Sequence, residues 1–146
     1  MIYEITGRCK NRKVVETLLT RLCKELGIAD HEANLEIRFV TECGEEGDES
    51  YGWAIADQEE GELEIAKTHK GKKVGFLMQM RTIVHEMVHI KQFLKGELDE
   101  QGIRWYGELY DNVPYSKQPW EIEAYGREDE LFMKCYPFNM DLTSGN

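Results

Sequence analysis

The sequence from Val74 to Leu94 reads VGFLMQMRTIVHEMVHIKQFL and contains the motif His85-Glu86-Met87-Val88-His89. Apolar residues recur at helical spacing through this stretch, and Arg81 is the only charged residue before His85. Gly96 follows the stretch as a stop signal for a helix. We therefore expect one helix of about 30 Å, at 1.5 Å per residue, which is long enough to cross a whole domain.

The motif places two imidazoles and one carboxylate close together on that helix. His85 and His89 lie about one turn apart and about 40° around the axis from each other, so both rings can face one cation. Glu86 is rotated by about 100° from His85 and lies beside such a cation. The flanking residues are apolar, and burying these polar groups without partners would be costly. The pattern therefore favours metal binding over histidines bonded only to backbone carbonyls, with Glu86 as the base that takes a proton from a metal-bound water.

Two imidazoles leave a catalytic zinc ion one protein ligand short, because such an ion binds three protein groups and keeps its fourth position for water. The metzincin continuation, a glycine and a third histidine, is excluded because Gln92 and Lys95 occupy those positions. The acidic segment from Pro119 to Glu128 opens the last predicted helix and supplies better candidates. Glu121 and Glu123 both remain open, since a shift of the helix boundary by a few residues would exchange them.

The rest of the sequence predicts a small domain of helices and strands. Apolar residues at helical spacing indicate helices, and period-two alternation of apolar and charged residues indicates strands. Residues 41–50 are acidic and are expected to form an exposed loop, and residues 97–119 a long connection with a strand over Ile103 to Tyr110. The other expected elements are a helix over residues 12–27 that stops at Gly27, a strand over Leu35 to Val40, a hairpin with strands from Tyr51 to Asp57 and from Glu62 to Lys67, and a last helix from Pro119 or Trp120 to Cys135.

The motif and the acidic segment together resemble the gluzincins, which are zinc peptidases whose second helix carries a glutamate ligand, often within Glu-x-x-Ala-Asp or Glu-x-Glu-Ala-Asn. Glu121, Glu123 and Ala124 match this pattern. The resemblance implies Glu121 as the third ligand of Zn²⁺ and leaves Glu123 as the alternative. Tyr125 stands where the family has Asp or Asn, a residue that bonds a ligating histidine. Glu128 lies two turns after Glu121 on the same face and is a candidate for this outer role.

The order of the predicted elements is similar to that of small gluzincin and SprT-like domains. The pieces Trp105-x-Gly107 and Pro119-Trp120-Glu121 are also similar to uncharacterised phage and bacterial metallopeptidases. The resemblance implies an α+β, zincin-like fold, in which a small antiparallel or mixed sheet lies over the motif helix and a C-terminal helix carries the glutamate ligand. SprT-like proteins often act near DNA and carry an added zinc ribbon, but this sequence has no Cys-x-x-Cys pair to build one.

The resemblance implies a zinc metallopeptidase. In such an enzyme Glu86 is the general base for the zinc-activated water that attacks the peptide bond. An extended polypeptide substrate would lie along an edge strand, for which residues 51–57 and 62–67 are both candidates. A second donor to the oxyanion would come from the long connection. The candidates there are Arg104, Tyr106, Tyr110 and Tyr115.

Two other functions stay open at this point. The metal could clamp the helices of a binding or regulatory module with little turnover. Such a structural site needs a fourth protein ligand and no base, so a glutamate directly after His85 favours catalysis. The third function is that of a zinc amidase that acts on a non-peptide amide.

The composition is that of one ordinary domain over residues 1–146, with a frayed tail at residues 137–146. The chain has 18 Lys+Arg and 28 Asp+Glu, and its net charge of −10 disfavours nucleic acid as a partner. No uninterrupted apolar run reaches the roughly 18 residues of a membrane span, and the N-terminus has no signal-peptide pattern. The scattered cysteines fit reduced thiols. The sequence thus predicts a cytoplasmic protein without a membrane partner.

Overall fold

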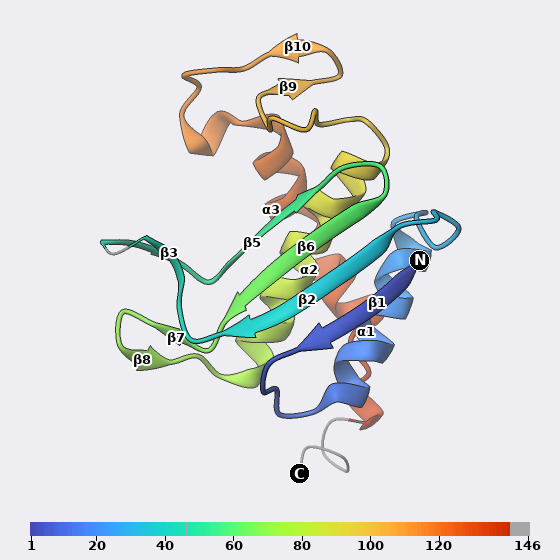
Figure 1. The fold of residues 1–146 in the computed structure, drawn as a ribbon, viewed down its shortest axis with the longest axis vertical. Coiled ribbons are helices and arrows are strands. Elements are labelled where there is room, and N and C mark those ends of the chain that lie inside the picture. The colour runs from blue at the N-terminus through green and yellow to red at the C-terminus, as the bar shows by residue number, and fades with distance from the viewer. Residues whose placement is uncertain (46, 141–146) are drawn as a thin grey trace.

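The computed structural model describes residues 1–45 and 47–140, which form three α-helices, one short 3-10 helix and a central four-stranded sheet (Figure 1). The helices are α1 (Arg12–Glu25), α2 (Phe76–Leu94), η1 (Tyr115–Lys117) and α3 (Pro119–Cys135). The strands of the sheet are β1 (Ile2–Thr6), β2 (Asn34–Val40), β5 (Gly52–Ala56) and β6 (Glu60–Ala66). The shorter strands are β3 (Cys43–Glu45), β4 (Asp48–Ser50), β7 (Thr68–His69), β8 (Lys72–Lys73), β9 (Arg104–Trp105) and β10 (Glu108–Leu109).

The sheet is mixed. Its strands follow the order β1-β2-β6-β5, so β1 and β5 are its two edges. β2 runs parallel to both of its neighbours, while β5 is antiparallel to β6 and forms the expected hairpin with it. Parallel pairing of β1 with β2 requires a crossover, and α1 supplies it. The structure thus confirms an α+β domain with a small mixed sheet.

The three helices cover one face of the sheet and leave the other face open (Figure 1). β2 shows how the sequence produces this arrangement. Leu35, Ile37 and Phe39 are buried in the core, whereas Glu36 and Arg38 between them are only half-buried. Because successive side chains of a strand point to opposite faces, this alternation buries one face against the helices and exposes the other.

α2 lies at the centre of the core. Every residue from Thr82 to Leu94 is buried, including the polar residues His85, Glu86, His89, Lys91 and Gln92. The helix ends at Leu94, and Gly96 follows its C-cap. The φ of 71° at Gly96 lets its N–H reach the Phe93 carbonyl while the next N–H reaches that of Gln92. Gly27 ends α1 in the same way, with a φ of 72°. Both glycines thus act as the stop signals that the sequence indicates.

Two expectations for the connecting segments are wrong. Residues 41–50 are not a simple loop, because β3 and β4 pair there in antiparallel fashion. Cys43 is the only buried residue of these two strands, so the alternation that predicts a half-buried strand is missing. The single strand expected over residues 103–110 is divided into β9 and β10. A two-residue turn at Tyr106 and Gly107, with φ values of 51° and 85°, reverses the chain between them.

The other predicted helices and strands are confirmed, with bounds that differ by at most two residues at either end. The expected fraying of residues 137–146 concerns in large part residues 141–146, which lie outside the described residues. Before them, Phe138 packs its ring against the rings of Phe132 and Tyr136. None of the described helices is both long enough and apolar enough to cross a membrane.

Gly52 lets β5 approach α2 closely. A Cβ atom at this position would lie 2.6 Å from Thr82 Cγ2 and 2.8 Å from the carbonyl oxygen of Glu64. We expect Gly52→Ala to lower the free energy of unfolding by about 1–3 kcal/mol, because the strand or the helix must shift. Gly126→Ala is the control, since a Cβ there would meet no atom of another described element within 4 Å, and alanine favours a helix by about 1 kcal/mol. Chemical unfolding compares the variants, and equal stability of both would contradict the close approach.

Candidate metal centre

α2 and α3 bring His85, His89 and Glu121 together in one group. Glu121 Oε1 lies 3.1 Å from His85 Nε2 and 3.2 Å from His89 Nε2. One ligand atom from each residue lies within 4.8 Å of the other two. Two imidazole nitrogens and a carboxylate oxygen are a donor set that binds divalent transition metals. The group could therefore hold a metal ion.

The local geometry of the two helices explains the convergence. His85 and His89 are one turn apart on α2, and their ring centroids are 5.0 Å apart with one ring edge toward the other. Glu121 lies in the first turn of α3, which begins at Pro119 as the sequence predicts. Ala124 is fully buried nearly one turn later. A side chain this small is compatible with the close packing of α3 on α2.

Each member of the group shifts the pKa of the others. Burial raises the pKa of Glu121, but the hydrogen bonds with His85 and His89 outweigh burial and lower that pKa to about 2. Burial lowers the pKa of each histidine, yet the hydrogen bond to Glu121 and the charge of Glu86 leave both of these pKa values raised. Glu121 is therefore ionised at neutral pH, as a carboxylate ligand of a metal must be.

Each ring has an outer partner at Nδ1. His85 Nδ1 lies 3.2 Å from Glu128 Oε1, and Arg81 donates a hydrogen bond of 3.1 Å to the other oxygen of Glu128. His89 Nδ1 lies 2.8 Å from Gln92 Oε1. Outer partners of this kind orient the rings of metal ligands. The structure thus brings Glu128 to the position that the sequence suggests for it.

Gln92 is a member of the site that the sequence analysis missed. In the sequence, Gln92 is notable only because metzincins have a glycine at its position. The signal that could have found it is its spacing of three residues from His89, which puts both side chains on one face of the helix. Full burial of an amide also requires partners for it, and His89 is one of them.

Glu123, the alternative ligand, does not join the group. Its carboxylate accepts hydrogen bonds from Lys91 Nζ at 2.6 Å and from Gln92 Nε2 at 2.8 Å, and it pairs with Arg127 at 3.3 Å. Two residues correspond to about 200° of rotation on a helix. Glu121 and Glu123 therefore contact different residues of α2, and Glu121 is the one that meets the histidines.

Glu86 lies beside the group at the wall of a cavity. The residue is only 7% exposed, and burial raises the pKa of its carboxyl, although the charges of His89 and His85 oppose this rise. The cavity has a volume of about 430 Å³, and His85 and Tyr115 also line it. A carboxylate in this place can exchange a proton with a molecule in the cavity.

Tyr115 is the one candidate oxyanion donor that lines this cavity. Its hydroxyl lies 3.2 Å from that of Tyr125, and it also hydrogen-bonds Glu121. Tyr125, which stands where gluzincins have Asp or Asn, packs its ring 4.4 Å from the ring of His85. The site therefore has two tyrosine hydroxyls at its opening, one of them in contact with the candidate ligand Glu121.

The other candidates for the oxyanion donor lie elsewhere. Tyr110 packs its ring against Trp120, and its hydroxyl bonds Glu108. Tyr106 lies in the turn between β9 and β10 and is 67% exposed. Arg104, in β9, is exposed as well. None of these three lines the cavity beside Glu86.

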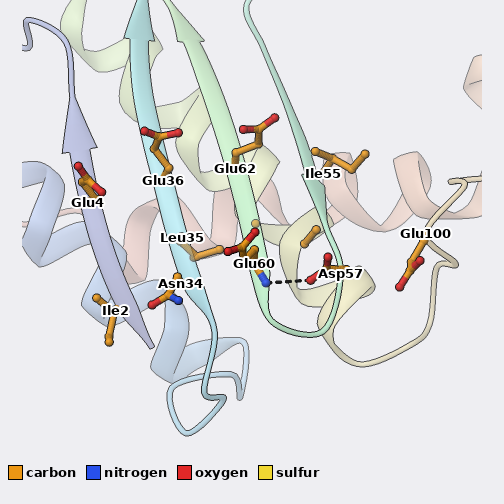
Figure 2. A pocket seen from close by; sticks show the side chains of 12 residues that line it. Ile2, Glu4, Asn34, Leu35, Glu36, Ile55, Asp57, Glu60, Glu62 and Glu100 are labelled. Carbon is orange, nitrogen blue, oxygen red and sulfur yellow. Dashed lines mark hydrogen bonds between the residues drawn. The ribbon is translucent and has the colours of Figure 1, made fainter.

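A larger groove, of about 740 Å³, lies on the open face of the sheet (Figure 2). It contains none of the residues His85, His89 and Glu121. Glu4, Glu36 and Glu62 are directly opposite one another across β1, β2 and β6. Figure 2 shows these carboxylates in a row on the open face. The groove is lined by no histidine, whereas His85 and Glu86 line the smaller cavity. The chemistry therefore points to the smaller cavity as the functional site.

No known protein family, no curated protein and no solved structure matches this chain.

Proposed function

We propose that this protein is a zinc-dependent metallopeptidase with a zincin-like fold. The observation that carries the proposal is the convergence of His85, His89 and Glu121, with Glu86 beside them at the wall of the same cavity as His85. Two imidazoles and one carboxylate fit the ligand set of catalytic zinc sites. When bound, Zn²⁺ would polarise the scissile carbonyl and lower the pKa of a water molecule to about 7.

The chain's own residues carry out the proton transfers. Glu86 accepts the proton of the attacking water and delivers it to the leaving amine. Burial raises the pKa of its carboxyl, and a carboxylate with a raised pKa is a stronger base. The Tyr115 hydroxyl donates to Glu121 in the resting site, and during the reaction it turns this single proton to the developing oxyanion of the carbonyl. His85, His89 and Glu121 hold the metal, and Glu128 orients the ring of His85.

A free sheet edge next to the site supports a polypeptide substrate. Of the two strands that the sequence leaves open, β6 pairs with β2 on one side and with β5 on the other. Within residues 1–45 and 47–140, β5 is thus the one of the two with an unpaired edge. The cavity beside Glu86 is lined by Tyr51 and Gly52 at the start of β5. An extended peptide can pair with such an edge through its backbone, which positions it without requiring a particular side chain.

The number of protein ligands supports catalysis over a purely structural metal. A structural zinc site has four protein ligands, whereas a catalytic site has three and an open position. Among the described residues, His85, His89 and Glu121 are the members of the group, and no fourth ligand joins them. Glu86 also has no role in a structural site. These features favour the peptidase over a metal-stabilised binding module.

Metal analysis combined with a hydrolysis assay tests the proposal. The purified protein should hold about one zinc ion per chain and cleave an unfolded polypeptide, and a chelator should remove both properties until zinc is restored. His85→Ala should abolish both as well. His31→Ala is the matched control, because His31 does not belong to the group. A protein that binds no zinc, or one whose hydrolysis survives the chelator, would rule the proposal out.

Tyr115→Phe tests the oxyanion donor. The variant keeps the ring but loses the hydroxyl, so we expect kcat to fall by about 10²-fold in saturating zinc, where the loss of its bond to Glu121 does not empty the site. Tyr110→Phe provides the comparison, because it removes a hydroxyl that bonds Glu108 outside the cavity. Steady-state kinetics of the two variants show whether Tyr115 is the donor to the oxyanion. Equal kcat values would assign the oxyanion to another donor.

A further inference from the structure

We propose that Gln92 is a positioning residue that holds the Nδ1–H of His89, so that the Nε2 of this ring is the nitrogen offered to the metal. This inference rests on the metal site of the proposed function. It goes further because it assigns roles to Gln92, Glu123 and Lys91, which contribute no ligand atom to the group formed by His85, His89 and Glu121.

The hydrogen bonds of Gln92 fix the orientation of its amide. Gln92 Nε2 donates to the carbonyl oxygen of Trp120 at 3.0 Å and to Glu123 Oε1 at 2.8 Å. An amide NH₂ group has two hydrogens, so both are used. Turning the amide over would place Oε1 against these two oxygen acceptors. The amide oxygen of Gln92 therefore faces His89, at 2.8 Å from Nδ1.

This orientation decides which nitrogen of His89 carries a hydrogen on that side. The amide oxygen only accepts hydrogen bonds, so Nδ1 must donate. Gln92 is 0% exposed. With the hydrogen fixed at Nδ1, Nε2 is the nitrogen left to coordinate, and it is the atom that faces Glu121.

Glu123 and Lys91 restrain the side-chain amide of Gln92 on the side away from His89. Glu123 accepts from Gln92 with one oxygen, and its other oxygen lies 2.6 Å from Lys91 Nζ. Lys91 also donates to Glu97 at 2.7 Å, and its side chain is only 8% exposed. Buried groups in a connected network have little freedom to turn. Glu123, the alternative ligand from the sequence, thus acts on the site through Gln92.

The two histidines therefore have different outer partners. The ring of His85 faces the carboxylate of Glu128, which carries a charge, and the ring of His89 faces a neutral amide. A change at Gln92 should act on His89 and leave His85 unaffected. This difference separates a positioning role from a general loss of packing, which would disturb both rings.

Cobalt binding tests the inference. We expect Gln92→Leu to weaken Co²⁺ binding by about 10- to 100-fold in a competition with a chromophoric chelator. Gln79→Leu is the matched control and should bind Co²⁺ as the wild type does. Gln79 is a buried glutamine of the same helix, and its amide reaches the carbonyl of Ala66 at 3.5 Å.

A spectroscopic readout separates positioning from packing. In the zinc-loaded wild type, the Nδ1–H signals of both histidines should exchange slowly with water in proton NMR spectra. In Gln92→Leu the signal of His89 should exchange rapidly or vanish, while the signal of His85 persists.

If both signals persist and cobalt affinity is unchanged, Gln92 does not position His89. If the wild type itself binds no Co²⁺, the proposed metal site fails and this inference fails with it.

Gln92→Glu keeps the test decisive if the leucine variant does not fold. The introduced carboxylate can still accept from His89, but its second oxygen would face Trp120 O and Glu123, so we expect weaker Co²⁺ binding than in the wild type. Adding Glu123→Gln supplies an N–H donor to that oxygen, and the double variant should bind Co²⁺ more tightly than Gln92→Glu alone. A double variant that binds no better than the single one would overturn the network.

Discussion

Glu86→Gln is expected to reduce peptide hydrolysis by about 10²- to 10⁴-fold, which is the contribution of a general base. Glutamine has nearly the same size as glutamate, but its amide cannot accept the proton of the attacking water. Glu86 is not a member of the ligand group, so the zinc content should stay at the wild-type level. Single-turnover kinetics and metal analysis of the same preparation measure the two quantities together.

The fold of this variant should be intact. Glu86 is buried, and burial raises the pKa of its carboxyl, which means that the ionised form is disfavoured at this position. A neutral amide of the same shape removes that cost. Glu36→Gln, on the open face of the sheet, is a matched control that should keep full activity. Wild-type hydrolysis by Glu86→Gln would exclude this residue from the mechanism.

The central helix and its two histidines could be predicted because the signals for them are local. The apolar spacing before and after His85 indicates a buried helix, and Gly96 indicates its end. The meeting of His85 and His89 then follows from helical geometry alone. The structure has this helix at Phe76–Leu94, two residues shorter at its start than expected.

The choice between Glu121 and Glu123 could not be made from the residues alone. The two acids are separated by about 200° of helix rotation, and an error of two residues in the start of the helix exchanges them. The resemblance to gluzincins favours Glu121. In the structure, α3 begins at Pro119, and Glu121 is the acid that reaches both rings.

Two other features were missed because their partners are far away in the sequence. β1, over Ile2–Thr6, is a short edge strand whose pairing with β2 lies more than 30 positions away. Gln92 depends on Trp120 and Glu123, which come from a different helix. A pattern within one segment gives the face that a side chain occupies, but it does not give the element that covers this face.

Glu121→Ala is expected to weaken zinc binding more than any change to an outer partner does. Loss of an outer partner costs about 10- to 100-fold in metal affinity, and removal of a ligand should exceed that range. The site would keep two imidazoles and lose the negative charge that partly balances the metal. Zinc affinity is measured by competition with a chelator of known affinity.

Glu123→Ala is the variant whose zinc affinity is compared with that of Glu121→Ala. Glu123 is two residues from Glu121 on the same helix, but it contacts Gln92, Lys91 and Arg127. Its removal frees the amide of Gln92 and should weaken zinc binding by at most about 100-fold, as expected for a group that acts through another residue. Should Glu123→Ala lose more zinc than Glu121→Ala, the two acids would have exchanged roles. α3 would then have to be rotated by about 200° relative to α2, and the contacts of Glu121 with both histidines would not describe the metal-bound protein.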